Sequence, residues 1–184
     1  MNKIEKIAKI SIYIIGFLLF LTVLYFGIDT NFRYLIMKND SRPEITSLKE
    51  NLKQLDCLTR NIYWEAATEP VEGKIAVAQV TMNRVNDGRF GNTVCSVVHQ
   101  KTRVAQQVVC QFSWVCENKH KVQPIAPEHY KESEDIAKKV LFENFRLPSL
   151  DDALFYHADY VNPRWNKKRI VKIGRHIFYK ERMK

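Results

Sequence analysis

The chain has 184 residues, of which 46% are hydrophobic and 27% charged, the composition of a folded protein with one domain of ordinary size. It contains six Gly and six Pro, no repeat with a period of 20–50 residues and no C-x-x-C pair, so collagen, solenoid and zinc-ribbon classes are excluded. The formal net charge is +9, and its distribution along the chain decides what it means.

The first predicted element is an apolar helix near the N-terminus. No charged residue occurs from Ile10 to Ile28, and these nineteen residues form a helix about 28 Å long, close to the thickness of the hydrocarbon layer of a membrane. Three lysines precede the run, so the positive-inside rule keeps the N-terminus cytoplasmic and exports the rest of the chain. A cleaved signal peptide is the alternative, but the run is long for one and ends without a small-residue cleavage site. We expect residues 1–28 to be a cytoplasmic tip and a signal-anchor in the inner (cytoplasmic) membrane, with the remainder on the periplasmic or extracytoplasmic side.

The positive charge is concentrated at the C-terminus. Arg164 to Lys184 contains nine Lys or Arg and one acid, a net charge of +8, whereas residues 29–163 are close to neutral at −1. An exported domain is not expected to bind nucleic acid. An anionic envelope polymer, an anionic membrane surface and a simply solvated basic tail are the interpretations that stay open.

All four cysteines follow the apolar run, and an even count in an exported domain favours two disulfides. Three connectivities are possible, and we prefer Cys57 with Cys95 and Cys110 with Cys116. A four-thiolate zinc site is less consistent with the sequence, because spacings of 38, 15 and 6 residues lack the paired knuckles of such sites.

Helical patterns dominate the exported chain. Residues 29–55 are expected to be a polar-aromatic connector followed by an amphipathic stalk, in which Ser47 and Glu50 have capping-box spacing. Residues 57–68 continue as a helix that ends before Pro70. The helix expected from Val71 to about Val85 contains residues 75–78, which are apolar on all sides and predict that the helix is buried. Residues 128–144 predict an amphipathic helix.

Two short strands follow these helices. Leu154 to Tyr156 and Ile177 to Tyr179 have strand character and are separated by turn signals at Pro163 and Gly174. Helices followed by strands in one domain predict an α+β fold in which helices dominate, occupying residues 56–184 and ending in the basic tail.

Glu65 is the principal candidate for catalysis. It lies between two aromatic residues and two alanines, and desolvation in a cleft raises a carboxyl pKa above its ordinary value of about 4.3, as a general acid requires. Glu69 lies four residues further on, and its like charge would also raise the pKa of Glu65 if the helix continues that far. Ordinary solvated helix acids are the alternative interpretation of both residues.

Other catalytic arrangements have weaker support. There is no G-x-S-x-G elbow for a serine nucleophile and no H-E-x-x-H helix for zinc. His157 and His176 are possible zinc ligands, although a His within an aromatic strand is more often a hydrogen-bonded core residue. Asp151 and Asp152 follow Ser149 and have the character of a turn or cap.

Several blocks of the sequence resemble the spore-cortex-lytic enzyme and cell wall hydrolase family. They occur in the family's order over residues 57–180: Ile62 to Val85, Phe90 to Val98, Cys110 to Trp114, Ala153 to Trp165 and Ile173 to Tyr179. The family often has Arg, Gly and Pro where this chain has Ala67, Thr68 and Gly91.

The resemblance implies a small α+β domain like those of lysozymes and lytic transglycosylases. It implies cleavage of peptidoglycan glycan strands between N-acetylmuramic acid and N-acetylglucosamine, without a cofactor or metal, and the family's catalytic Glu falls on Glu65. A hydrolase normally uses a second carboxylate, whereas a lytic transglycosylase, as the resemblance suggests, needs one acid. One well-placed carboxylate favours the transglycosylase, although Glu69 or Glu72 remains available for hydrolysis.

Candidate substrate contacts surround this acid in the sequence. Aromatic faces suit the apolar faces of sugar rings, and Gln and Ser side chains suit N-acetyl groups. The candidates are Tyr63, Glu69, Gln111, Ser113, Trp114, Tyr156, His157 and Trp165. Two rival functions remain, a zinc-dependent peptidoglycan amidase and a non-catalytic wall-binding accessory protein. Cell wall remodelling, germination and phage lysis are all compatible roles, and the sequence predicts no oligomeric state.

Overall fold

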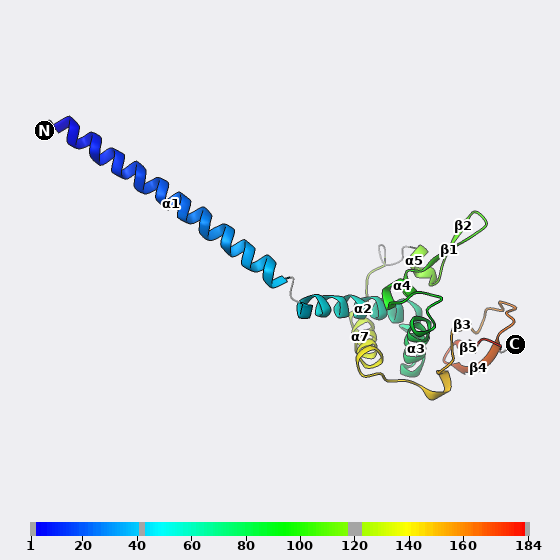
Figure 1. The fold of residues 1–184 in the computed structure, drawn as a ribbon. Helices are drawn as coiled ribbons and strands as arrows, with labels where there is room; N and C mark the ends of the chain where they lie inside the picture. The colour runs from blue at the N-terminus through cyan, green and yellow to red at the C-terminus, as the bar shows by residue number, and fades with distance from the viewer. Residues whose placement is uncertain (1–2, 41–42, 118–122, 183–184) are drawn as a thin grey trace. The chain divides into compact units, whose positions relative to one another are not determined.

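A computed structural model describes residues 3–40, 43–117 and 123–182, and the chain divides into two units, Met1–Lys49 and Glu50–Lys184. The first unit holds helix α1 (Lys3–Asp40) and the beginning of α2 (Pro43–Ala66) (Figure 1). Within α1, Tyr13–Lys38 is long and apolar enough to cross a membrane, and none of its apolar window is buried. The expected connector is helical up to Asp40.

Three long helices organise the second unit, as the sequence predicted. The remainder of α2 is followed by α3 (Val71–Asp87) and α7 (Pro127–Phe142), which packs against α3. Helix α3 ends at Gly88, whose φ of 77° is a left-handed conformation that glycine adopts without strain. The Gly88 N–H donates to the Arg84 carbonyl and closes the helix.

Helix α3 lies between two hydrophobic clusters. Ile75 and Ala78 belong to the larger cluster, which α2, α4, α5 and α7 complete. Ala76 and Val80 belong to a smaller cluster with Phe178 of the sheet. Because both faces of α3 are covered, its apolar residues occur all round the helix, and the prediction that it is buried is confirmed.

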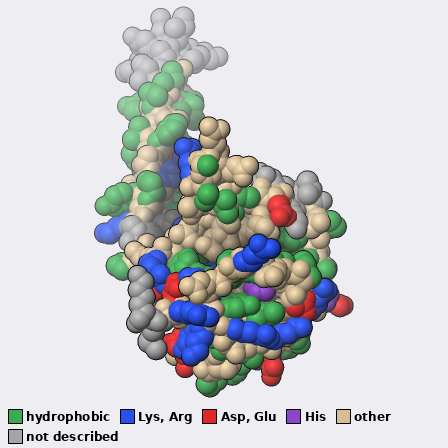
Figure 2. Space-filling view, turned by 90° about the vertical axis from the view of Figure 1, so that its right-hand side faces the viewer, with side chains coloured by type: hydrophobic (Ala, Val, Ile, Leu, Met, Phe, Trp, Pro, Cys, Tyr) green, Lys and Arg blue, Asp and Glu red, His purple; other side chains and the backbone are tan. Residues whose placement is uncertain are grey.

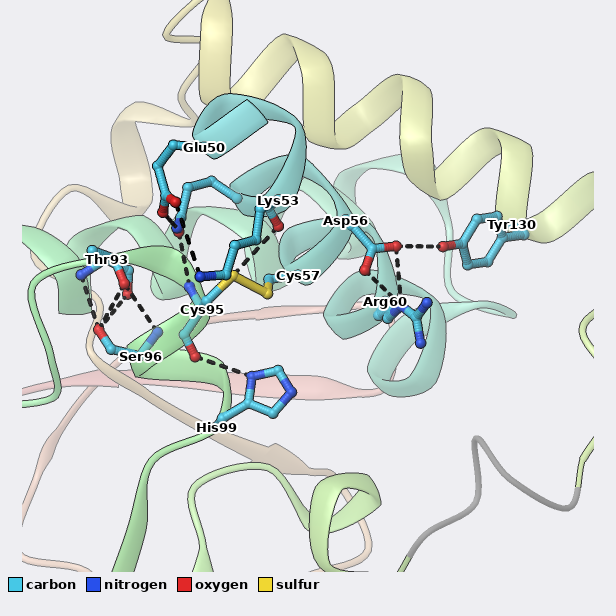
Figure 3. Close-up of a disulfide and its surroundings, with 11 residues drawn as sticks. Glu50, Lys53, Asp56, Cys57, Arg60, Thr93, Cys95, Ser96, His99 and Tyr130 are labelled. Atoms are coloured by element: carbon cyan, nitrogen blue, oxygen red, sulfur yellow. Dashed lines mark hydrogen bonds and ion pairs between the residues drawn. A yellow bond between two sulfur atoms is a disulfide. The ribbon is translucent and has the colours of Figure 1, made fainter. Parts of the chain in front are cut away.

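A disulfide joins α2 to the short helix α4 (Val94–Val98). Cys57 is bonded to Cys95, and the surroundings of this bond are drawn in Figure 3. Thr93 and Ser96 form a reciprocal capping box at the start of α4. The backbone N–H of Cys95 donates to the Gln54 side chain at 3.0 Å, a second link between the two helices.

A two-stranded hairpin and a short helix follow α4, and the sequence analysis predicted neither. Strand β1 (Lys101–Val104) pairs antiparallel with β2 (Gln107–Cys110), and α5 (Ser113–Glu117) comes next. Cys110 is bonded to Cys116 in α5. The two disulfides therefore have the connectivity preferred from the sequence.

The C-terminal part forms a three-stranded antiparallel sheet in the order β3-β5-β4. Its strands are β3 (Phe155–Ala158), β4 (Lys168–Ile173) and β5 (His176–Lys180), preceded by a 3-10 turn, η1 (Pro148–Leu150). The expectation of a basic tail is wrong, because residues 168–180 are two paired strands. Figure 2 shows the Lys and Arg side chains gathered on this side of the molecule. The predicted helix-dominated α+β fold is confirmed.

Candidate active site

Glu65 lies in a cleft between the end of α2 and strand β3. The cleft has a volume of about 310 Å³. Four segments supply its walls: the last turn of α2, the end of α3, the loop closed by the Cys110–Cys116 disulfide, and β3 with the loop that follows it. The lining residues are Glu65, Arg84, Gln111, Phe112, Ser113, Phe155, Tyr156, His157, Val161, Pro163 and Trp165.

Tyr156 holds the Glu65 carboxylate. Its hydroxyl donates a hydrogen bond of 3.0 Å to Glu65 Oε2. Burial raises the pKa of Tyr156 well above its ordinary value, and the neighbouring Glu65 acts in the same direction, while Arg84 opposes them. Tyr156 is therefore a phenol over the physiological pH range and remains a hydrogen-bond donor to the carboxylate.

Arg84 is a buried cation beneath the cleft, with 4% of its surface exposed. Its Nε donates to the Leu154 carbonyl at 2.8 Å, and its guanidinium lies over the rings of Phe90 and Phe112. Burial lowers the pKa of Arg84, whereas Tyr156 and Glu65 raise it. The side-chain amide of Gln111 finds hydrogen-bond partners when its oxygen faces Arg84. In this orientation the oxygen accepts hydrogen bonds of 3.1 and 3.3 Å from the two terminal nitrogens of the guanidinium. Arg84 thus links the residue just before β3 to the loop that carries Gln111.

Aromatic side chains form the wall on the side of the sheet. Trp165 is 43% exposed, and its ring contacts those of Phe155, His157 and Tyr179. His157 is fixed from both ring nitrogens: Nε2 lies 2.9 Å from the Tyr179 hydroxyl, and Nδ1 lies 2.8 Å from the Ala158 carbonyl oxygen. An exposed indole on a rigid support is a suitable surface for a sugar ring.

Three predicted contact residues do not line the cleft. Tyr63 and Trp114 are buried in the core, with 8% and 3% exposure, so neither offers a ring face to a sugar. The Tyr63 hydroxyl accepts from the Ala126 N–H, and the Trp114 indole N–H donates to Asn61. Glu69 lies after the end of α2, where its Oε2 accepts from the Arg175 N–H at 2.8 Å. Its contact is with the β4–β5 turn.

The two histidines suggested as zinc ligands lie on opposite faces of the sheet. His157 pairs across the ladder with Ile177, whereas His176 pairs with Ala158. Paired residues share a face and successive residues alternate, so the two imidazoles point away from each other. The His176 ring packs against Tyr156 and Phe178 instead. This geometry does not suit one metal ion held by both residues.

The remaining candidate carboxylates lie away from the described lining of the cleft. Glu72 is exposed in the first turn of α3. Asp151 and Asp152 line a separate surface cavity of about 500 Å³, and Asp152 pairs with Lys180 at 2.7 Å.

The sequence analysis missed Arg84 and the apolar lining residues Phe112, Phe155, Val161 and Pro163. Arg84 gave one usable signal, a charged residue within a helix predicted to be buried, where a cation needs partners. The apolar residues gave none, because only the fold distinguishes cleft walls from core.

The cell wall hydrolase family model matches residues 68–179, which is more than half of the chain. The chain therefore belongs to the cell wall hydrolase family. The match begins three residues after Glu65 and includes the other lining residues of the cleft.

The chain is also similar to characterised proteins of this kind. It is 27% identical over 125 residues to the spore cortex-lytic enzyme of Bacillus subtilis, a match that covers 66% of this chain and 35% of that protein. Against the Oceanobacillus iheyensis enzyme the identity is 28% over 130 residues, covering 68% and 41%. The chain thus spans less than half the length of these relatives.

Two solved structures resemble the fold. The catalytic domain of the germination-specific lytic transglycosylase SleB from Bacillus anthracis matches with a TM-score of 0.51 and 28% identity, over 69% of this chain and 93% of that domain. The SleB catalytic domain of Bacillus cereus gives the same TM-score and identity, over 71% and 91%. The similarity therefore extends over nearly the whole of a catalytic domain.

Proposed function

We propose that this chain cleaves peptidoglycan glycan strands between N-acetylmuramic acid and N-acetylglucosamine as a lytic transglycosylase with Glu65 as its catalytic acid. One observation carries the proposal: Glu65 is the only carboxylate among the described residues that line the cleft. Hydrolysis normally uses two carboxylates that flank the scissile bond. Membership of the cell wall hydrolase family and the likeness to a lytic transglycosylase domain support the same activity.

The reaction needs a proton donor that later accepts a proton. Protonated Glu65 delivers its proton to the glycosidic oxygen as the bond from this oxygen to C1 of the muramic acid breaks and positive charge develops at C1. The 6-hydroxyl of the same sugar then bonds to C1 and returns its proton to Glu65. The products are a free 4-hydroxyl on N-acetylglucosamine and a 1,6-anhydro ring, and no water is consumed.

The other cleft residues bind and orient the substrate in this proposal. Tyr156 holds the carboxylate through its hydrogen bond to Oε2. Gln111 and Ser113 offer amide and hydroxyl groups to N-acetyl substituents. Trp165, supported by His157, offers a ring face to a sugar.

The first unit is proposed to anchor the enzyme to the membrane. Residues 1–28 act as a cytoplasmic tip and signal-anchor, 29–55 as connector and stalk, and 56–184 as the catalytic domain outside the cytoplasm. The apolar stretch Tyr13–Lys38 supports this arrangement, because its 26 residues exceed the roughly 20 that a helix needs to cross a bilayer.

Mass spectrometry of the products identifies the reaction. The full chain in detergent is incubated with purified sacculi, and soluble muropeptides are analysed. We expect fragments ending in 1,6-anhydro-N-acetylmuramic acid. Reducing-end muramic acid would show hydrolysis, and free stem peptides without sugar fragments would show an amidase, so either result contradicts the proposal.

Glu65→Gln tests the acid itself. The variant keeps the size and hydrogen-bonding capacity of the side chain but loses the transferable proton. We expect it to fold normally and to lose activity by about 10²–10⁴-fold, the usual contribution of acid–base catalysis. Glu72→Gln is the matched control, because Glu72 is an exposed carboxylate of α3 that does not line the cleft. Wild-type activity of the Glu65 variant excludes this residue from the mechanism.

A further inference from the structure

The β1–β2 hairpin is an exposed ribbon at the edge of the candidate active site. Figure 1 shows it projecting from the body of the second unit beside α4 and α5. Every residue of β1 is exposed, and three valines carry large exposed fractions: Val104 60%, Val108 51% and Val109 49%. A two-stranded ribbon is marginally stable by itself. Valine side chains that remain exposed to water contribute no hydrophobic stabilisation.

The base of the hairpin is held firmly, and it leads directly into the cleft. The Gln111 N–H donates to the Gln100 carbonyl at 2.9 Å and continues the ladder one residue beyond β2. The Cys110–Cys116 disulfide ties the end of β2 to α5. Gln111 itself lines the cleft, where its side chain meets Arg84.

Strand alternation assigns the two faces of the ribbon. Val109 has the same parity as Gln111 and pairs with Thr102, so these side chains lie on the face that continues from the cleft. Val108 has the parity of Cys110, whose side chain turns toward α5, and it pairs with Arg103. The face continuous with Gln111 therefore contains Thr102, Val104, Gln107 and Val109 and has no charge, whereas Lys101 and Arg103 lie on the opposite face.

We propose that the uncharged face of the hairpin, with Val109 at its centre, binds the part of the peptidoglycan glycan strand that extends beyond the cleaved bond. This inference rests on the proposed function. The cleft volume of about 310 Å³ is at the lower end of the range for sites that hold one small molecule. A polymer therefore continues onto the surface beside the cleft, and the face reached through Gln111 offers methyl groups and a hydroxyl to its N-acetylated sugars.

The ribbon supplies its own matched control for this proposal. Val108 and Val109 are adjacent and almost equally exposed, but they lie on opposite faces. We expect Val109→Asp in the full chain to raise the half-saturating concentration of sacculi about three- to tenfold. On a four-sugar peptidoglycan fragment without stem peptides, which covers less of the ribbon, the loss should be smaller than on sacculi. Val108→Asp should change neither measurement by more than twofold.

Equal effects of the two substitutions, or no effect of Val109→Asp, would overturn the proposal. Equal losses would show a hairpin that acts without a preferred face, for example by touching a membrane surface. A loss on the four-sugar fragment as large as that on sacculi would place Val109 in the cleft itself and would also overturn the proposal.

A binding measurement separates this proposal from the reaction. In a chain that also carries Glu65→Gln, co-sedimentation with intact sacculi reports binding without cleavage. Val109→Asp should weaken this binding three- to tenfold while Val108→Asp does not. If the unmodified chain releases no sugar product yet this difference persists, the proposed reaction fails and the binding face stands. If the difference is absent, the binding face fails whatever the reaction.

Discussion

At the scale of single residues, the hydrogen bond from Tyr156 to Glu65 is the contact closest to the proposed chemistry. A hydrogen bond donated to a carboxylate favours its charged form. In Tyr156→Phe, Glu65 therefore keeps its proton to a higher pH. Because the acid must be protonated to react, the basic limb of the pH–activity profile should move to higher pH, and kcat should fall about tenfold as the carboxylate loses its support.

Tyr160→Phe is the control for this prediction. Tyr160 is 78% exposed and contacts Arg175, so loss of its hydroxyl should leave both the profile and kcat unchanged. A Tyr156→Phe enzyme with the wild-type pH profile would show that the hydroxyl has no influence on the acid.

We expect His176 to make the stability of the fold depend on pH. It is 8% exposed, its Nδ1 has no hydrogen-bond partner among the described residues, and burial lowers its pKa, an effect that Glu69 and Asp159 oppose. In the unfolded chain a His titrates near 6.5, so below about pH 6.5 the unfolded state binds the proton more readily than the folded state. The free energy of unfolding should therefore fall as the pH drops from 8 to 5, and His176→Gln should reduce this fall.

Urea unfolding at the two pH values measures the effect. His129→Gln is the matched control, because His129 is exposed on α7 and its substitution should leave the pH dependence unchanged. The quantity compared is the change between pH 8 and pH 5, since a packing loss at His176 lowers stability at both values. An unchanged fall in His176→Gln would show that this ring does not cause it.

At the scale of secondary-structure elements, the Cys110–Cys116 disulfide encloses three consecutive cleft residues, Gln111, Phe112 and Ser113. A loop of this size stabilises the fold by only about 2 kcal/mol through the unfolded state, against about 4 kcal/mol for the 38-residue separation of Cys57 and Cys95. We expect the double substitution of Cys110 and Cys116 by Ser to lower kcat/KM on sacculi about tenfold, because the cleft wall loses its constraint.

Replacement of Cys57 and Cys95 by Ala is the comparison. These residues join α2 to α4 at the core, so their loss should lower the thermal midpoint more than loss of the short bridge does, while the remaining folded protein stays active. Activity and midpoint are measured on both variants. Equal activity of the Cys110/Cys116 variant and the unmodified protein would contradict a role of this bridge in shaping the cleft.

The elements differ in how well their sequences predict them. Helix α3 was predictable because residues 75–78 are apolar on all sides, and β3 and β5 because short aliphatic and aromatic runs are separated by turn signals. Strand β4 was not predicted and was counted in a basic tail, since its charged residues find partners only in the fold: Lys172 pairs with Asp159, and Lys167 just before the strand pairs with Glu181. The β1–β2 hairpin has no buried face and hence no burial pattern to detect.

The candidate site was also predictable only in part, because the sequence does not show which of its aromatic residues the fold buries. Glu65 was chosen from its apolar setting and from the family resemblance, and it lines the same cleft as Tyr156, His157 and Trp165. Its catalytic role stays a prediction. Tyr63 and Trp114 were included because aromatic faces suit sugar rings, and an aromatic residue has the same sequence signature in a core as in a binding site. Only the packing of α2 against α5 distinguishes the two.

At the scale of the whole molecule, the proposed membrane anchor and the hydrophobic clusters belong to different units. Every member of both hydrophobic clusters comes from Leu55 or later, so the described cores contain no side chain of α1. The apolar side chains of Tyr13–Met37 are not covered by other parts of the described chain. Water is a poor solvent for so large an apolar surface. Both observations fit the proposed role of α1 as a membrane anchor.

A chain that begins at Pro43 tests this division. It keeps all of α2 and both hydrophobic clusters, so its thermal midpoint should lie within a few degrees of the full chain, and it should cleave sacculi without detergent. The full chain should sediment with membranes and resist extraction by high salt, whereas the shortened chain should stay in the supernatant. If the shortened chain does not fold, α1 has a structural role in the second unit. If high salt extracts the full chain from membranes, its attachment is electrostatic, through its basic residues, and α1 does not span the membrane.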